Sequence, residues 1–404
     1  MTRRRLLLLA LAQILSSTAV GLCITIASVT ALELSGTEAV AGLAQTSMVV
    51  GATLLTLPVS WIAARRGRRA SLVFAFGAAA VGSAVSLAGV LAGSWPVLLL
   101  GMIGIGAGSV AGLAIRFAAA DGVSGASVPR AIGFVMWAST VGAIVGPNAV
   151  APISRALGFE PPVAVFAVLV GLFVLGALML ALFVPDVVPP EGHGQKGPGI
   201  RAQFGLLWSR PDARRALWLA MMSHAAMVGL MAMAPVHLHH MDEPLSVVGL
   251  IISLHMVSMY ILSPLFGSFV ARLGAARVGM LGLLTNIAGA VILALAPAGN
   301  AFVFGVGLSV IGFGWSMGMI SASTIVTLTV PAENKTSAQG VLDLGVNLAG
   351  GLGSVLAGAV VAGWGYPALA YIVLGLAAFV LVVIAPLLRS DRAGVSRAAV
   401  RVDA

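Results

Sequence analysis

The sequence predicts an all-helical integral membrane protein made of two related halves, each with six spanning helices. Of its 404 residues, 59% are hydrophobic and 9% are charged, and the mean hydropathy is +1.07. A chain of this composition cannot cover an apolar core with a polar surface, so a lipid bilayer has to solvate it.

The sequence also contains an internal repeat, because aligning it with itself at an offset of 207 residues matches its first half to its second. The positions that coincide are Ala64 with Ala271, Arg65 with Arg272, Gly67 with Gly274, Gly133 with Gly340, and Gly146 with Gly353. An internal repeat of this length is typical of transporters that move one half against the other.

Twelve apolar stretches are long enough to cross the bilayer, because a spanning helix needs about 20 residues. In chain order they are residues 6–30, 38–63, 70–92, 96–119, 129–152, 162–185, 215–236, 246–270, 277–297, 300–328, 337–362 and 367–388. The first stretch follows Arg3, Arg4 and Arg5, as a signal peptide would, but its apolar run is too long for a signal core. We therefore expect it to stay as a spanning helix. The lone Cys23 lies inside it and excludes an internal disulfide.

The positive residues determine the predicted orientation. With the amino terminus inside, 21 of the 22 Lys and Arg residues lie on the cytoplasmic side and only Arg155 lies outside. The positive-inside rule then predicts a multi-pass protein of the cell membrane with both termini in the cytoplasm. The same placement accounts for the net charge of +9 without a nucleic-acid partner.

The fifth stretch, residues 129–152, spaces its glycines along one helix before a proline. These positions are Gly133, Gly142, Gly146 and Pro147. Proline removes a backbone donor and kinks a helix, and small residues let membrane helices pack closely. The pattern resembles the antiporter motif of drug/proton exporters in the major facilitator superfamily (MFS), except that Val150 and Ala151 replace its final glycine pair. The resemblance covers the whole chain, implies the MFS fold of two pseudo-symmetric six-helix bundles, and favours export. Glycines that only permit close packing are the alternative.

The loop between the second and third stretches resembles a second pattern of the same family. That pattern reads glycine, three residues, aspartate, arginine, any residue, glycine and two basic residues, and here Ser60 and Ala64 replace the first glycine and the aspartate. The matching residues are Arg65, Gly67 and Arg68 in the first half and Gly267, Arg272 and Gly274 in the second. In the family this loop closes the cytoplasmic side, which would pair Arg68 with Asp121 as a cytoplasmic gate. The alternative is that these arginines only anchor the topology.

A polar segment rich in Pro and Gly, residues 186–213, separates the halves. We expect a six-helix bundle over residues 1–188, a cytoplasmic linker over 189–209 and a second bundle over 210–404. Every other loop is too short for a soluble catalytic or ATP-binding domain, and no phosphate-binding loop ends in Lys and Ser or Thr. A gradient therefore has to drive transport, and no cofactor is expected.

Ionisable residues inside the spans are few, and Asp343 is the only carboxylate among them. Burying a charge there costs on the order of 2.5–3.5 kcal/mol, which selects for a partner or a function. Asp343 either titrates during proton coupling or pairs with Arg65 or Arg66 in place of the missing gate aspartate. The fourth stretch lacks the buried arginine that proton-coupled family members often carry before its glycine run. We expect Arg116, nearer the cytoplasm, at the membrane boundary.

Two histidines lie near the predicted midplane, His224 in the seventh stretch and His255 in the eighth, level with Asn347. Histidine titrates near neutrality, so both are proton-coupling candidates, and the alternative is a hydrogen-bonded residue between packed helices. At the outer end of the seventh stretch, His237 and His240 share a helical face and are weak candidates for a metal site. A polar cap at the lipid boundary is the simpler interpretation, so no metal is expected.

We therefore predict a proton-driven exporter of a small lipophilic compound that works as a monomer by alternating access, without enzymatic activity. In the resembling family the cavity is lined by the first, fourth, seventh and tenth spans. The candidates for cavity residues are Gln13, Met222, Met227, Trp315 and Asn347, with His224. Methionine-rich apolar walls suit adaptable hydrophobic ligands. Two alternatives stay open, an importer of a nutrient or metabolite and an integral-membrane enzyme that uses the histidines and Asp343.

Overall fold

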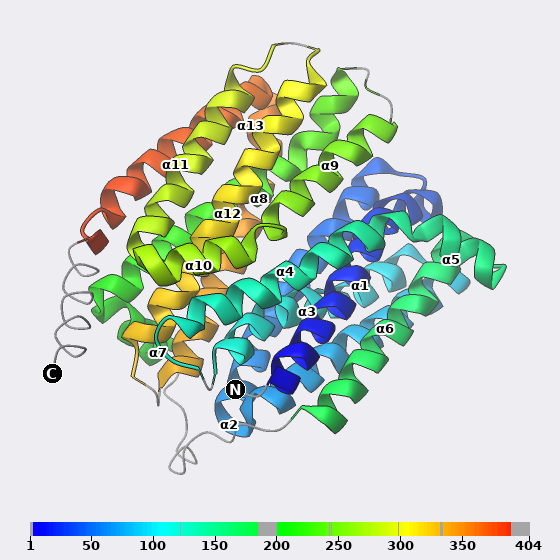
Figure 1. The fold of residues 1–404 in the computed structure, drawn as a ribbon. Helices are drawn as coiled ribbons and strands as arrows, with labels where there is room; N and C mark the ends of the chain where they lie inside the picture. Colours follow the sequence, from blue (N-terminus) through cyan, green and yellow to red (C-terminus); the bar gives the residue numbers. More distant parts are fainter. Residues whose placement is uncertain are drawn as a thin grey trace, which may run out of the picture. The chain divides into compact units, whose positions relative to one another are not determined.

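The computed structural model describes residues 3–121, 123–184, 200–241, 243, 245–297, 299–331 and 334–388, and this part of the chain is helical throughout, with no strand (Figure 1). The helices are α1 Arg3–Ser35, α2 Glu38–Leu91, α3 Trp95–Ala120, α4 Ser127–Asn148, α5 Val150–Leu157, α6 Pro161–Phe183, α7 Ile200–Ser209, α8 Pro211–His240, α9 Leu245–Tyr260, α10 Ser263–Leu273, α11 Ala275–Ala294, α12 Ala301–Thr329 and α13 Lys335–Ile384. The predicted all-helical fold is confirmed.

The described helices contain twelve membrane spans. Eleven stretches are long and apolar enough to cross a bilayer, and one of them, Thr46–Leu91, runs through a break at Gly67 and so holds two spans. The eighth predicted span consists of α9 and α10, separated by a turn at Ile261 and Leu262. The predicted kink near Pro147 takes the form of a break just after it, where α4 ends at Asn148 and α5 begins at Val150.

The internal repeat is visible in the backbone. Gly67 and Gly274 lie 207 residues apart, and their φ angles are 85° and 93°. Gly158 and Gly365 have the same separation, with φ angles of 70° and 77°. These angles lie in the region that only glycine enters without strain. The two halves of the sequence therefore place glycines with positive φ between corresponding spans, and the turns at Gly67 and Gly274 also agree in ψ, 171° and 149°.

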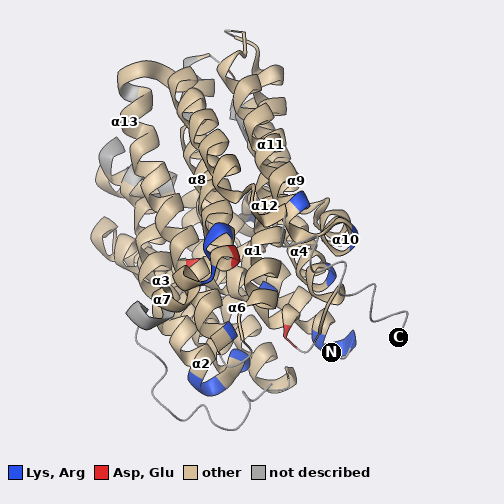
Figure 2. Cartoon of the chain, turned by 90° about the vertical axis from the view of Figure 1, so that its left-hand side faces the viewer, with Lys and Arg blue, Asp and Glu red and all other residues tan. Residues whose placement is uncertain are grey.

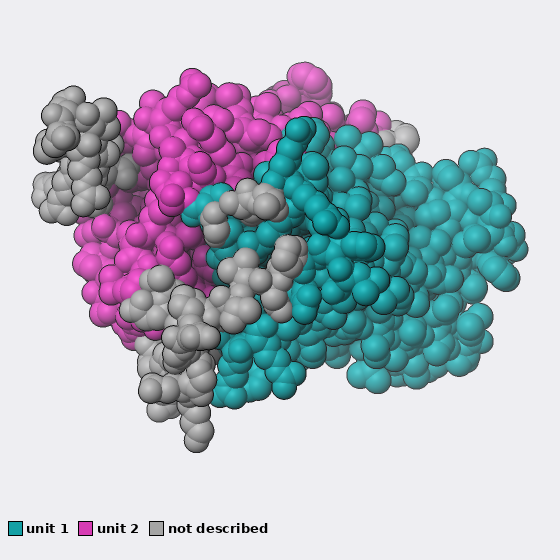
Figure 3. Space-filling model, turned by 60° about the horizontal axis from the view of Figure 1, so that its bottom comes forward, with its two compact units in different colours: residues 1–123, 135–199 teal, residues 124–134, 200–404 magenta. Residues whose placement is uncertain are grey.

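The chain forms two compact units, coloured separately in Figure 3. Unit 1 comprises residues 1–123 and 135–199, and unit 2 comprises residues 124–134 and 200–404. Helix α4 takes part in both, because its first residues cluster with unit 2 and the residues from Val135 onward cluster with unit 1. Of the predicted linker, residues 189–199 lie outside the described residues, and residues 200–209 form α7.

Helices in unit 1 cross at glycines. A Cβ atom added to Gly104 of α3 would lie 2.7 Å from the Cα of Gly82 in α2, and one added to Gly51 would overlap the backbone of Ile103. Lipid offers no hydrophobic force between helices, so close packing of this kind has to hold them together. Large apolar side chains such as Leu54, with 60% of its surface exposed, point outward instead.

Lys and Arg residues are unevenly distributed, and the uppermost part of the view in Figure 2 shows none of them. In unit 1 the Arg5 and Arg68 side chains both reach the end of α3, whereas Arg155 follows the far end of α4. In unit 2, Arg210 at the start of α8 donates to the Thr329 carbonyl at the end of α12. The end of each unit that carries these arginines is the end expected in the cytoplasm.

Candidate functional site

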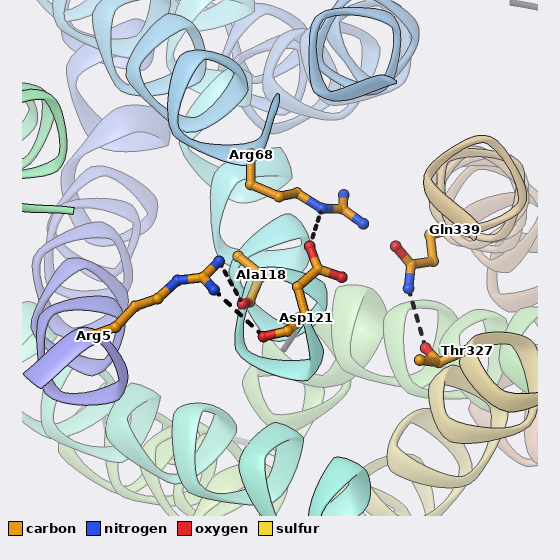
Figure 4. A network of polar contacts seen from close by, with 6 residues as sticks. All are labelled: Arg5, Arg68, Ala118, Asp121, Thr327 and Gln339. Carbon is orange, nitrogen blue, oxygen red and sulfur yellow. Dashed lines mark hydrogen bonds and ion pairs between the residues drawn. The ribbon is translucent and has the colours of Figure 1, made fainter. Parts of the chain in front are cut away.

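An arginine–aspartate network fastens the basic end of unit 1 (Figure 4). The Arg68 Nε atom lies 3.0 Å from Asp121 Oδ2, and Arg68 is 8% exposed. From α1, the Arg5 guanidinium donates to the backbone carbonyls of Ala118 and Asp121 at 3.3 and 3.4 Å. The last carbonyls of a helix lack partners within it, and two of them at the end of α3 are bonded by Arg5. Sequence reasoning placed Arg68 beside Asp121 but missed Arg5.

Gly67 provides the turn that brings Arg68 to this network. Its φ of 85° and ψ of 171° break α2 between two spans, so the residues before and after it point in different directions. Ala64 leaves Arg65 without the carboxylate of the family pattern, and Arg65 lies 4.3 Å from the centroid of the Trp61 ring instead. This cation–π contact was missed, although the spacing of four residues on one helix could have indicated it.

The matching turn in unit 2 contains Gly267, Arg272 and Gly274. A Cβ atom added to Gly267 would lie 2.5 Å from the Pro129 carbonyl oxygen at the start of α4. Gly274 has a φ of 93° and joins α10 to α11, and Arg272 in the last turn of α10 is exposed. The glycine positions thus provide close packing and a turn, and a gating role for this set stays a prediction.

The motif glycines of α4 are contact points on two faces. A Cβ atom on Gly142 would overlap the backbone of Ser17 and Thr18 in α1, and one on Gly146 would lie 3.0 Å from the Cα of Gly21. Pro147 packs at the same place, 3.3 Å from a Cβ added to Gly21. Gly133, at the other end of α4, similarly meets the Ser263 carbonyl of α10 within unit 2. These contacts give the sequence spacing a definite packing role.

In unit 2, His224 of α8 joins an aromatic cluster. Its Nδ1 atom lies 3.0 Å from Nε1 of Trp315 in α12, and the Tyr260 ring of α9 stands at 88° to that indole, 5.6 Å away. The indole nitrogen can only donate, so His224 Nδ1 accepts and the neutral ring carries its proton on Nε2. A second proton would have to enter at Nδ1 and break this bond. Sequence reasoning found both His224 and Trp315 but missed Tyr260.

His255 of α9 has the opposite arrangement. It is fully buried, and its Nδ1 lies 2.7 Å from the Leu308 carbonyl oxygen of α12, so Nδ1 carries the proton. Its Nε2 atom is buried and has no hydrogen-bond partner within the described part of the chain. His255 can therefore accept a second proton at Nε2 while it keeps its bond to Leu308.

The first part of α13 carries the buried carboxylate. Asp343 is 4% exposed, and among the acidic side chains that the structure describes it alone is buried. One turn later the Asn347 side chain donates to the Asp343 backbone carbonyl at 2.9 Å. One turn earlier, Gln339 donates to Thr327 Oγ1 of α12 at 3.1 Å (Figure 4). Asp343 therefore lies in a polar strip of α13 within unit 2.

Unit 1 has its own buried polar contact. Gln13 of α1 donates to Ser139 Oγ of α4 at 2.7 Å, and Ser16 donates to the Gly108 carbonyl of α3 at 2.8 Å. The cavity candidates Met222 and Met227 of α8 are 7% and 5% exposed. The cavity candidates from the sequence, Gln13, Met222, Met227, Trp315 and Asn347, are thus all buried.

The structure adds detail to two further sequence interpretations. Arg116 is 2% exposed, with its guanidinium carbon 4.7 Å from the centroid of the Phe117 ring, and its position at the membrane boundary stays a prediction. The last two turns of α3 are buried on every side, which draws this arginine into unit 1. His237 is part of an aromatic cluster instead of a polar cap, stacked 4.7 Å from the Tyr366 ring. The side chain of His240 lies outside the described residues.

Comparison with known proteins identifies the family. The model of the Major Facilitator Superfamily matches residues 9–247 and 243–402, which together span nearly the whole chain. The chain belongs to the Major Facilitator Superfamily. As an MFS protein it is a multi-pass membrane transporter, and the relatives and structural neighbours described here are transporters. The predicted MFS fold is confirmed, whereas the drug/proton antiporter branch stays a prediction.

Two curated MFS relatives cover most of the chain. The uncharacterized MFS-type transporter YdeG of Bacillus subtilis is 26% identical over 380 residues, which is 92% of this chain and 88% of that protein. The riboflavin transporter RfnT of Brucella anthropi is 28% identical over 393 residues, 94% of each chain.

Solved structures share the fold at low identity. The human organic anion transporter MFSD10 (TETRAN) has a TM-score of 0.78 and 17% identity, with 95% of this chain and 99% of that chain covered. The fucose:proton symporter FucP of E. coli has a TM-score of 0.74 and 15% identity, with 94% and 97% covered. These neighbours establish the MFS fold and leave the substrate undetermined.

Proposed function

We propose that this transporter exports small, largely apolar compounds in exchange for protons, by alternating access between its two halves. The observation that supports export most directly is the glycine spacing of α4, Gly133, Gly142, Gly146 and Pro147, which resembles the antiporter motif. A Cβ atom on Gly133 or Gly142 would overlap a neighbouring backbone, and one on Gly146 would lie 3.0 Å from the Gly21 and Thr18 backbone. Close packing at these glycines is what we expect of a helix that controls how the two halves move.

Three residues are proposed to carry protons. Asp343 is the first, because it is the one buried carboxylate among the described acidic side chains and lies within a membrane span, where ionisable groups are rare and mark proton pathways. His224 is the second, since protonation at Nδ1 would release Trp315 and change the surface next to it. His255 is the third, through its unpartnered Nε2 atom. In this scheme proton binding and substrate binding compete for the same part of unit 2.

The substrate class follows from the same residues. Trp315 and Tyr260 offer flat aromatic faces, and Met222 and Met227 offer flexible apolar side chains one to two turns along the same region of α8. Such walls adapt to apolar ligands of different shapes, while the Asn347 side chain of unit 2 would orient one polar group. We propose small lipophilic compounds carried by a monomer.

The gate is proposed at the basic end of each unit. The ion pair of Arg68 and Asp121 holds the break in α2 at the end of α3. We assign the same gating role in unit 2 to the turn at Gly274. The positive-inside rule favours a cytoplasmic position for both these turns and both termini.

Everted membrane vesicles test this proposal. Vesicles containing the protein are acidified inside with a respiratory substrate, and accumulation of ethidium is followed by fluorescence. We expect accumulation that collapses with a protonophore and is lost in Asp343→Asn, which keeps the side-chain shape but cannot titrate. Thr285→Ser, an exposed polar position on α11, is the matched control. Accumulation by Asp343→Asn that still follows the pH gradient would assign Asp343 to the gate instead.

The relative RfnT favours a second candidate, transport of riboflavin or a similar flat aromatic nutrient. The aromatic pair of Trp315 and Tyr260 suits such a ring system as well. Riboflavin fluorescence in intact cells distinguishes the two functions. Uptake that depends on this protein, with no ethidium accumulation in everted vesicles, would replace the export proposal.

A further inference from the structure

Three exposed residues form a basic corner beside the break in α2. They are Trp61, Arg65 and Arg66. Trp61 is 52% exposed and lies under the Arg65 guanidinium, 4.3 Å away, and both arginines are exposed. Among the described residues of unit 1, neither Arg65 nor Arg66 has a carboxylate partner, in contrast to the buried pair of Arg68 and Asp121. The basic corner therefore presents two uncompensated positive charges next to an aromatic ring.

An apolar groove lies on the outside of the same helices. Its volume is about 580 Å³, and side chains of α2 and α3 line it without a charged group. The lining includes Leu54, Phe74, Gly77, Val81, Leu100 and Gly104. Leu54, Val81 and Leu100 are each at least 60% exposed, which shows that the groove opens to the outer face of unit 1. In a membrane protein that face meets lipid chains.

The groove and the basic corner share one face of α2. Leu54, Trp61 and Arg65 are spaced by seven and four residues, which aligns them within a narrow stripe of a helix that turns every 3.6 residues. At about 1.5 Å per residue, Leu54 and Arg65 are roughly 16 Å apart along the axis. An acyl chain lying in the groove would thus end at the arginines. Tryptophan beside them fits the headgroup level, where such rings concentrate.

We propose that this surface binds one anionic phospholipid, with an acyl chain in the groove and the phosphate at Arg65 and Arg66. The cytoplasmic leaflet is rich in anionic lipids, and nearby arginines favour them by charge. A second copy of the chain is a poorer occupant. Two copies side by side in one membrane would face each other at the same depth and bring two basic corners together.

The internal repeat supplies a natural control. Arg272 occupies the position of Arg65 in the second half, but Ser268 stands where Trp61 would be, and its hydroxyl donates to the Pro264 carbonyl at 2.9 Å. Arg277 is also exposed there. Unit 2 thus has two exposed arginines at the corresponding turn without the tryptophan that completes the basic corner.

Native mass spectrometry of the detergent-solubilised protein tests the site. Palmitoyl-oleoyl phosphatidylglycerol and phosphatidylcholine, which differ only in the headgroup, are titrated separately. We expect the wild type to bind one phosphatidylglycerol molecule preferentially. The Arg65→Gln/Arg66→Gln double variant should bind that lipid with an affinity lower by roughly tenfold or more, because each arginine contributes about 1 kcal/mol. The Arg272→Gln/Arg277→Gln variant should keep the preference.

A second pair of variants tests the groove. A side chain at Gly77 would meet nothing within 4 Å, so Gly77→Leu should fill the groove without disturbing the fold and should remove the bound lipid. Gly375→Leu adds the same side chain at an equally open, exposed position of α13 and should leave binding unchanged. As a measurement on the wild type, a photoactivatable phosphatidylglycerol should crosslink to peptides that contain residues 54–81.

Three results would overturn the proposal. The first is an Arg65→Gln/Arg66→Gln protein that retains the full headgroup preference. The second is crosslinking confined to other helices. The third is a dimer in the mass spectrum that Gly77→Leu converts to a monomer, since a second copy would then occupy the groove.

Discussion

At the scale of single residues, the two histidines of unit 2 differ in which nitrogen holds the proton. His224 accepts from Trp315 at Nδ1, whereas His255 donates from Nδ1 to the Leu308 carbonyl. A second proton therefore breaks a contact at His224 and leaves the known contact of His255 intact. Only the first case converts protonation directly into a change of side-chain packing. His224 is for this reason the better candidate for a switch.

The substitution His224→Asn separates these roles. The amide oxygen of Asn can take the place of Nδ1 and accept from Trp315, but it does not titrate. We expect His224→Asn to keep thermal stability within about 1 kcal/mol of the wild type, because the hydrogen bond persists. We also expect it to lose transport driven by a pH gradient, measured in everted vesicles. If His224→Asn retains gradient-driven transport while Trp315→Phe lowers the melting temperature, His224 is a packing residue.

The ion pair of Arg68 and Asp121 gives a second prediction. Asp121→Asn leaves the 8% exposed Arg68 side chain without its anion, and we expect a loss of about 1–3 kcal/mol. For a unit of this size that loss corresponds to a melting temperature lower by about 2–12 °C, measured by thermal unfolding in detergent. Asp212→Asn is the control, since its pair with Arg215 is more exposed and is expected to cost under about 1 kcal/mol. A double-mutant cycle with Arg68→Gln should show coupling; strict additivity would contradict this interpretation.

At the scale of helices, glycines determine how closely the spans approach. Gly142 places the α4 backbone against α1, and Gly104 places α3 against Gly82 of α2. Other glycines, such as Gly171 of α6, have open space around them. A glycine that packs against another helix should therefore be sensitive to substitution, whereas a glycine with open space around it should tolerate a side chain.

Two alanine substitutions test this contrast. Gly142→Ala forces a methyl group into the α1 backbone, and we expect it to destabilise the protein by about 1–3 kcal/mol and to reduce transport. Gly171→Ala should be neutral or stabilising by up to about 1 kcal/mol, because alanine favours the helix and meets no neighbour. Thermal unfolding of both variants in the same detergent is the measurement. Equal effects at the two positions would remove the packing role from the α4 motif.

The spans and turns could be predicted because their signals are local. Apolar length indicated every span, and Gly67 and Gly274 marked turns that need a positive φ. The pair of Arg68 and Asp121 was expected from the family resemblance. Contacts between residues far apart in the sequence could not be predicted. Examples are the contact of Tyr260 with Trp315 and the hydrogen bonds of Arg5 at the end of α3. The burial of Arg116 could not be predicted for the same reason, since helix packing alone decides that the end of α3 is buried.

At the scale of the whole molecule, the repeat and the charge distribution support one arrangement in the membrane. Glycines with positive φ recur 207 residues apart, and the order of the spans predicts every arginine other than Arg155 on the cytoplasmic side. Because translocating arginines is unfavourable, these charges should hold the orientation of all spans together. If the predicted number of spans were wrong by one, every arginine after the error would move to the other side of the membrane.

Cysteine labelling tests this orientation directly. The single native cysteine, Cys23, is buried, so Cys23→Ser provides a background without reactive thiols. Glu160→Cys, at the start of α6 and on the Arg155 side, should react with a membrane-impermeant maleimide in intact cells. Gly194→Cys, in the predicted linker, should react only in everted vesicles. The reverse pattern would place the basic ends of both units outside and would turn the proposed direction of transport around.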